Sequence, residues 1–105
     1  MILSTTNNID GRPVKDYLGI VTGETIIGAN IFKDFFASIR DVVGGRSGSY
    51  EKVLREAKDT ALKEMTENAV RMNADAIIGI DLDYEIVGSK WGMLMVAALS
   101  TIVKL

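Results

Sequence analysis

The amino-acid sequence predicts a single α+β domain in which a curved, mostly antiparallel sheet packs on one long and one short helix. Residues 49–73 carry apolar side chains at helical spacing, which predicts a long helix. Residues 76–87 and 91–105 are strand-like segments joined by a connection of hairpin length. Residues 14–29 are rich in β-forming residues. A chain of 105 residues supports one domain with a modest core.

The composition excludes several classes of function. The chain contains no cysteine and no histidine, so thiolate catalysis, imidazole bases and the usual ligands of transition metals are absent. The net charge is −2, so neither a nucleic-acid partner nor an anionic membrane is expected. The first residues lack the basic and apolar regions of a signal peptide, and we expect a cytoplasmic protein.

The N-terminal half is expected to form extended structure and a short helix. Residues 1–6 form a short extended segment, and a loop through Pro13 leads to a strand over 14–29. Glycines inside this strand indicate bulges or bends, so we expect it to be long and curved. Its alternation places Leu18, Ile20 and Thr22 on one face. Residues 30–43 predict a short helix that holds all three phenylalanines and ends at a glycine pair.

The main helix, over 49–73, is expected to be amphipathic. One face of the helix is expected to be an apolar stripe. The other face has Lys/Arg and Asp/Glu at i,i+4 spacing, which is typical of a solvated surface. The apolar stripe consists of Tyr50, Val53, Leu54, Ala57, Ala61, Met65, Ala69 and Met72.

The strand over 76–87 should pack one face against the helices and expose the other. The first face is expected to hold Ile78, Ile80, Leu82, Tyr84 and Ile86, and the second Gly79, Asp81, Asp83 and Glu85.

The final segment, 91–105, is expected to be a strand antiparallel to its neighbour, although a buried helix over 91–99 is the alternative. It is apolar on both faces, so both must be covered. Two helices cover only one face of the sheet, and a second copy of the chain is expected to cover the rest. The apolar run over 91–103 is shorter than the roughly 20 residues that span a bilayer. The sequence therefore predicts a homo-oligomer, closed as a ring.

An anion site is the first candidate for function. Arg46, Ser47, Gly48 and Ser49 combine flexible backbone, hydroxyls and a guanidinium at the start of the main helix, where anions bind. The alternative is a linker in which Ser49 caps the helix and Arg46 faces solvent.

A hard-cation site is the second candidate. Asp81, Asp83 and Glu85 fall on one face of a strand, and oxygen ligands suit Ca²⁺, Mg²⁺ or Mn²⁺. The alternative is a face kept soluble by charge, or the rim of an oligomer pore. The sequence specifies no cofactor and leaves a divalent metal open.

Catalysis has no equivalent signal. No pair of Asp, Glu, Lys, Tyr, Ser or Thr residues shows a diagnostic spacing, so we predict no catalytic residue and favour a non-enzymatic role. The alternatives are a scaffold or interaction protein without a small ligand, or a carboxylate-dependent hydrolase.

Four segments of the chain resemble the YbjQ-like family across nearly its whole length. They are residues 20–24, 28–36, 44–51 and 74–81, of which the run from Gly28-Ala29-Asn30 to Ser49-Tyr50-Glu51 is highly specific. The resemblance implies an α+β subunit with a curved sheet that assembles as a ring, typically a homopentamer. The family is uncharacterised and labelled putative heavy-metal-binding. Heavy metals prefer thiolate and imidazole ligands, and the thioethers of Met65, Met72, Met93 and Met95 are expected in the core.

Overall fold

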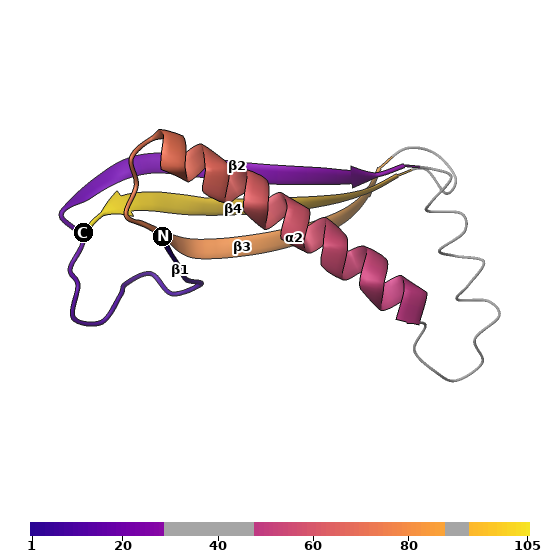
Figure 1. The fold of residues 1–105 in the computed structure, drawn as a ribbon, viewed down its shortest axis with the longest axis horizontal. Coiled ribbons are helices and arrows are strands. Elements are labelled where there is room, and N and C mark those ends of the chain that lie inside the picture. Colours follow the sequence, from indigo (N-terminus) through magenta and orange to yellow (C-terminus); the bar gives the residue numbers. More distant parts are fainter. Residues whose placement is uncertain (29–47, 88–92) are drawn as a thin grey trace.

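The computed structural model of the chain describes residues 1–28, 48–87 and 93–105, with side chains described except at 48–50, 86 and 87. Its elements are β1 (Ile2–Leu3), β2 (Asp16–Ile27), α2 (Gly48–Arg71), β3 (Ala76–Val87) and β4 (Met93–Lys104). The strands form one mixed sheet in the order β1-β3-β4-β2, and only the short β1–β3 pair is parallel (Figure 1). The predicted α+β class is confirmed. The predicted short helix over 30–43 lies outside the described residues.

The final segment is a strand at the centre of the sheet, so the helical alternative is wrong. β4 pairs with β2 on one side, from Leu94 to Lys104, and with β3 on the other, from Met93 to Val103. Pairing on both sides satisfies the backbone hydrogen bonds of β4 but covers neither of its faces. On the face towards α2, Leu94, Val96, Ala98 and Ile102 are buried.

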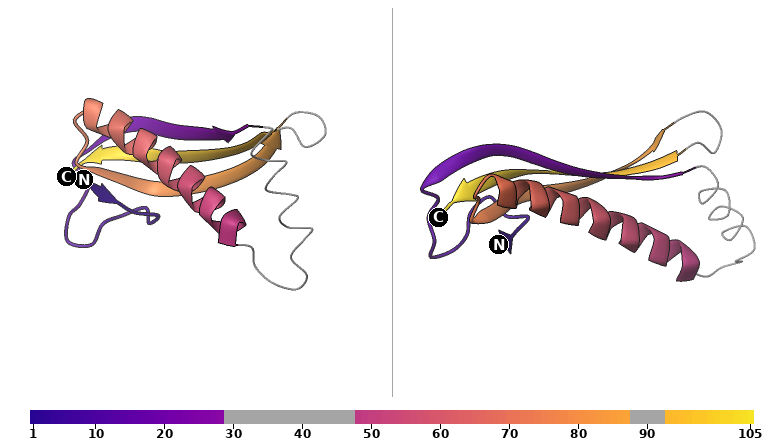
Figure 2. Two further views of the ribbon diagram at one scale, coloured as in Figure 1. Left: turned by 45° about the vertical axis from the view of Figure 1, so that its right-hand side comes forward. Right: turned by 45° about the horizontal axis from the view of Figure 1, so that its top comes forward.

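The main helix crosses this face of the sheet (Figure 2). Its buried row consists of small residues around one large one, namely Ala57, Ala61, Met65 and Ala69. Small side chains let the helix approach β2 closely at Gly23. A Cβ atom added to Gly23 would lie 2.0 Å from the Ala61 carbonyl oxygen and 2.6 Å from the Met65 backbone nitrogen. Gly23 is therefore required by helix packing, whereas a bulge or bend was expected at the strand's glycines.

The C-terminal end of α2 has a Schellman motif. Asn73 adopts a left-handed conformation with φ 59°, its backbone N–H donates to the Val70 carbonyl, and the Ala74 N–H donates to the Ala69 carbonyl. Since the helix ends at Arg71, Met72 lies beyond the packed stripe and is 47% exposed. The prediction that Met72 belongs to the buried stripe is wrong.

Two β-bulges change which residues share a face. The register of β2 shifts between Tyr17 and Gly19, so Leu18 packs with the core under α2 while Ile20 lies on the opposite face. The register of β3 shifts between Ile78 and Asp81, where Gly79 has φ 60°. The predictions that Leu18 shares a face with Ile20, and Ile78 with Ile80, are wrong. Each bulge inserts one residue and reverses the alternation beyond it.

The N-terminal segment covers one end of the sheet face opposite α2. Ile2, Ile9, Val14 and Leu105 pack there against a second, smaller core formed by Ala76, Ile78 and Val103. Backbone hydrogen bonds attach the segment to β3, from Ser4 N to the Ile77 carbonyl at 2.9 Å and from Gly79 N to the Thr6 carbonyl at 2.8 Å. Beyond this end, no described element covers the face.

Candidate functional site

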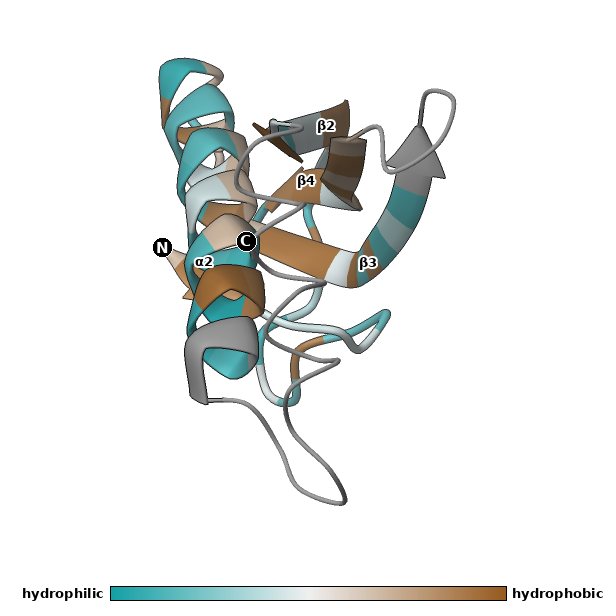
Figure 3. Cartoon of the chain, turned by 90° about the vertical axis from the view of Figure 1, so that its right-hand side faces the viewer, coloured by the Kyte–Doolittle hydropathy of each residue, from teal (hydrophilic) through white to brown (hydrophobic). Residues whose placement is uncertain are grey.

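The sheet face opposite α2 is the most distinctive surface of the described part of the chain. We call its uncovered portion the open face. It consists of Ile20, Thr22, Glu24 and Ile26 from β2, Met93, Met95, Ala97, Leu99 and Thr101 from β4, and Asp81, Asp83 and Glu85 from β3. Figure 3 shows α2 on one side of the sheet and the strongly apolar β4 at its centre.

Large apolar side chains of the open face are exposed to solvent. Ile20 is 73% exposed, Ile26 58%, Leu99 51% and Met93 39%. Met95 and Ala97 lie between them on β4 and are half-buried. We call Ile20, Ile26, Met93, Met95 and Leu99 the apolar strip. Continuous apolar patches of this kind mark interaction surfaces on soluble proteins.

The acidic row, Asp81, Asp83 and Glu85, borders the apolar strip along β3. All three side chains are exposed. The β-sheet register pairs Asp81 with Leu99, Asp83 with Ala97 and Glu85 with Met95, so each carboxylate stands beside the central strand. The row is on one face, as predicted, because all three residues follow the Gly79 bulge and keep their mutual alternation.

The acidic row does not converge on a point within one subunit. Residues two apart on a strand are about 7 Å apart, so the three carboxylates are spread along β3. Among the described residues, no three His, Cys, Asp or Glu side chains are grouped closely enough to hold a metal. The predicted cation site therefore stays a prediction.

The predicted anion site lies at the edge of the described region. Arg46 and Ser47 lie outside it, while Gly48 and Ser49 form the first residues of α2. The prediction that the long helix begins at this point is confirmed. The role of Arg46, Ser47, Gly48 and Ser49 in holding an anion stays a prediction.

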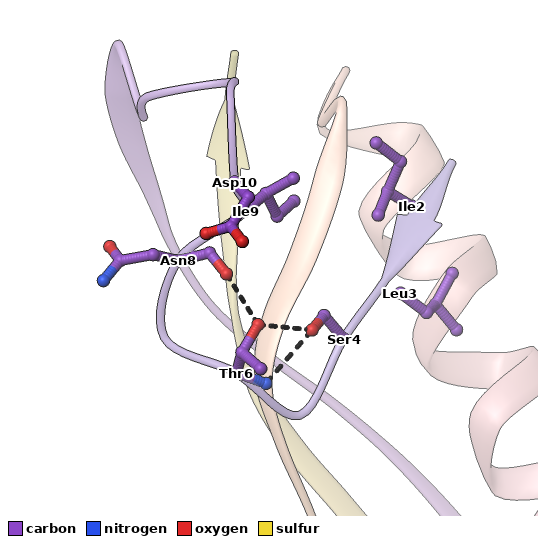
Figure 4. Close-up of a pocket in the computed structure, with 7 residues that line it drawn as sticks. All are labelled: Ile2, Leu3, Ser4, Thr6, Asn8, Ile9 and Asp10. Carbon is purple, nitrogen blue, oxygen red and sulfur yellow. Dashed lines mark hydrogen bonds between the residues drawn. The ribbon is translucent and has the colours of Figure 1, made fainter.

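A shallow hollow of about 300 Å³ lies in the N-terminal segment and was not anticipated from the sequence. Figure 4 shows its lining residues, Ile2, Leu3, Ser4, Thr6, Asn8, Ile9 and Asp10. Its polar groups bond to one another: the Thr6 backbone N–H donates to Ser4 Oγ at 3.1 Å, and Thr6 Oγ1 donates to the Asn8 carbonyl at 2.6 Å. These bonds stabilise the loop, and the hydroxyls involved are already occupied.

Asp75 is the titratable group most clearly perturbed by its surroundings in the described part. Its carboxylate accepts a hydrogen bond from the Leu105 backbone N–H at 3.0 Å, and the Lys104 ammonium lies 3.6 Å away. The hydrogen bond from Leu105 and the charge of Lys104 lower the pKa of Asp75. The pair joins the start of β3 to the end of β4, which is a structural role.

The described part contains no helix with the length and apolar character needed to span a membrane.

Comparison with solved structures places this architecture among known ones. The chain is similar to a crystal structure of a protein of unknown function from Pediococcus pentosaceus, which belongs to the DUF74 family. The two share 17% sequence identity with a TM-score of 0.62, and the match covers 100% of this chain and 97% of the other. At this identity the similarity establishes the fold.

Comparison with family models identifies the chain itself. The model that matches, YbjQ, is described as putative heavy-metal-binding and covers residues 1–105. This match confirms the resemblance drawn from residues 20–24, 28–36, 44–51 and 74–81. The chain belongs to the YbjQ family of putative heavy-metal-binding proteins.

Proposed function

We propose that this chain is the subunit of a non-enzymatic homo-oligomeric ring, a homopentamer, that binds a small ligand. The observation that carries the proposal is the apolar strip, whose side chains are exposed on an otherwise well-packed sheet. The sequence resemblance described above implies the same kind of assembly. A cytoplasmic location and the absence of a nucleic-acid partner stay sequence-based predictions.

The energetics of the apolar strip favour its burial by another copy. Fully burying one exposed aliphatic side chain contributes about 1.5–3 kcal/mol. Scaled by the exposed fractions of Ile20, Ile26, Leu99 and Met93, the four side chains together contribute roughly 3–7 kcal/mol. Association costs about 4–15 kcal/mol, so the strip offsets much of this cost but requires further contacts for tight assembly.

The oligomeric state tests the first part of the proposal. Sedimentation velocity and light scattering over a range of concentrations should give a species with five times the 11.4 kDa mass of the chain. A single species at the monomer mass at every concentration would contradict the proposal. A discrete oligomer of another size would retain assembly and reject the pentamer.

Ligand binding is the second part of the proposal, and two predicted sites serve it. An anion would bind at Arg46, Ser47, Gly48 and Ser49, and a hard divalent cation at Asp81, Asp83 and Glu85. Thermal shift with phosphate, nucleotides, Mg²⁺, Ca²⁺ and Mn²⁺ tests both sites. The anion response should be lost in Arg46→Ala and the cation response in Asp83→Asn, while Glu64→Gln, on the exposed side of α2, should respond as the wild type does. No stabilisation by any ligand would favour the scaffold alternative.

The family's heavy-metal label fits the donor atoms of this chain poorly. Thiolate and imidazole ligands are absent from the sequence, and heavy metals prefer them. Among the methionines, Met65 is fully buried, whereas Met72 and Met93 are exposed. The expectation that Met72 and Met93 lie in the core is therefore wrong, but thioethers alone do not supply the thiolate and imidazole ligands that heavy metals prefer. The proposal consequently rests on anions and hard cations.

A further inference from the structure

β2 is an edge strand whose outer side pairs with no strand of the described part. It has 12 residues and lies at the end of the sheet, with β4 on one side only. The unpaired backbone groups of such an edge are a template for a strand of another molecule, which leads to aggregation. Exposed apolar side chains increase this hazard, and Ile20 and Ile26 of β2 are both exposed. A fold with this edge is expected to protect it.

The Thr22 carbonyl is one of the groups on the outer edge. Val21 is paired with Ser100 of β4, and the Ser100 hydroxyl donates to the Val21 carbonyl at 3.4 Å, so this carbonyl points into the sheet. Successive carbonyls along a strand point to opposite sides. The Thr22 carbonyl therefore points away from β4, towards the place where a further strand would bond to it.

A side chain of α2 already occupies this carbonyl. The Nδ2 group of Asn68 donates to the Thr22 carbonyl oxygen at 2.9 Å. α2 reaches the edge because its backbone packs directly on β2 at Gly23, where no Cβ atom intervenes (Figure 1). Asn68 is half-buried, so its amide is partly withdrawn from water. Its hydrogen bond thus takes the place that an N–H of an added strand would take.

Arg71 fixes the orientation of the Asn68 amide. Its guanidinium, on the next turn of α2, donates to Asn68 Oδ1. A guanidinium only donates hydrogen bonds, so it selects the oxygen of the amide and leaves the NH₂ group facing Thr22. Without Arg71 the amide is free to turn its oxygen towards the Thr22 carbonyl, and two acceptors do not bond. Asn68 and Arg71 therefore act as one unit.

The neighbouring positions of the outer edge are protected in other ways. The β-bulge that ends at Gly19 lies just before Ile20, and a bulge twists an edge away from a partner strand. Glu24 places an exposed charge two residues after Thr22, and charges on an edge oppose pairing. Thr22 lies between these two features and has neither, so its protection comes from Asn68.

We infer that Asn68, oriented by Arg71, is an edge guard that prevents a strand of another molecule from adding to β2. The inference goes beyond the proposed ring and its ligands, because it concerns unwanted association through the β2 edge. It assigns a function in solubility to two polar side chains that have no place in the candidate sites.

Thioflavin T fluorescence and light scattering under native conditions test the edge guard. Asn68→Ala should accelerate association about five- to tenfold, because the freed carbonyl gains one net hydrogen bond from an added strand. Arg71→Met keeps the apolar stem and should have a smaller effect in the same direction, although the more negative net charge opposes association. Thr60→Ala should behave as the wild type does, because its hydroxyl bonds within α2, to the Glu56 carbonyl.

A loss of stability also causes aggregation, and two further variants separate the causes. Ser100→Ala removes a buried hydroxyl but frees no carbonyl on the outer edge. At the same unfolded fraction in urea, it should associate more slowly than Asn68→Ala. Thr22→Lys places a charge at an exposed position of the edge itself and should cancel the effect of Asn68→Ala. The same charge at the exposed Thr60 of α2, in Thr60→Lys, should not cancel it.

Three results would overturn the inference. The first is association of Asn68→Ala at the wild-type rate. The second is an equal rate for Asn68→Ala and Ser100→Ala at the same unfolded fraction, which would assign the effect to stability. The third is rescue by Thr60→Lys as complete as that by Thr22→Lys, which would assign the effect to net charge and not to the edge of β2.

Discussion

Gly23→Ala should destabilise the fold strongly, although it adds only one methyl group, at a buried position of β2. The added Cβ would lie 2.0 Å from the Ala61 carbonyl oxygen, 2.6 Å from the Met65 nitrogen and 2.9 Å from the Met65 Cβ. Two of these atoms belong to the helix backbone, so no rotamer change relieves the contact. The helix and β2 must separate by about 1 Å to restore ordinary contact distances, and a gap of that size forfeits roughly a quarter to a half of the dispersion energy of the facing atoms.

The magnitude follows from this displacement. Overpacking a core costs about 1–3 kcal/mol and occasionally more. The gap would run along the buried row of Ala57, Ala61, Met65 and Ala69, which places Gly23→Ala at the upper end, about 3 kcal/mol. For a domain of this size, the melting temperature should fall by about 12–24 °C.

Urea denaturation at fixed protein concentration measures this cost, because oligomer stability depends on concentration. The matched control is Gly28→Ala, since nothing lies within 4 Å of a Cβ atom there and such surface changes stay within about 0.5 kcal/mol. Ala61→Gly should not rescue Gly23→Ala, because the contacting atom of Ala61 is its backbone oxygen. A cost below about 1 kcal/mol would refute the close approach of α2 to β2.

Three further predictions concern single positions. Gly79→Ala should cost about 1–2 kcal/mol in urea denaturation, because φ is 60° there, and Gly79→Asn should cost less, since Asn tolerates this conformation; equal costs would contradict backbone strain. Thr25→Val should stabilise the fold by about 1 kcal/mol, because the buried Thr25 Oγ1 lacks a hydrogen-bond partner in the described part; Thr60→Val, at an exposed position, is the control, and destabilisation by Thr25→Val would indicate a missed partner. Asp75 has a lowered pKa, so its stabilisation is full above its unfolded value of 3.8 and is lost as the pH falls through the lower, folded value; melting curves of wild type and Asp75→Asn should therefore converge in acid, and a constant gap would contradict this linkage.

Much of the fold could be predicted because the spacing of apolar residues over a long segment indicates whether it forms a helix or a strand. The bounds of β3 match the prediction, and α2 and β4 differ from it by a few residues. The wrong assignments of strand faces occurred beside glycines. A sequence does not distinguish Gly79, which takes a left-handed conformation in a bulge, from Gly23, which makes room for a helix backbone. Both are single glycines in a β-rich run, and only the packing around them decides their role.

The candidate site was partly predictable for the same reason. Asp81, Asp83 and Glu85 lie beyond the bulge, so their spacing of two still places them on one face. Their surroundings could not be predicted, because they depend on which strand neighbours β3. The exposure of the Ile20 side chain could not be predicted from the sequence either. The bulge between Tyr17 and Gly19 places Ile20 on the open face, opposite to Leu18.

The bulge at Gly79 decides which side chains of β3 lie on the open face. Ile77 precedes the bulge and faces α2, and with regular alternation Asp81 and Asp83 would face it too, while Ile80 and Leu82 would face outward. The inserted residue reverses this order, so that Ile80 and Leu82 pack under the helix and the carboxylates stand beside Leu99 and Ala97. A single glycine in β3 thus places negative charge along the border of the apolar strip. The position of the acidic row beside the apolar strip is therefore set by backbone geometry.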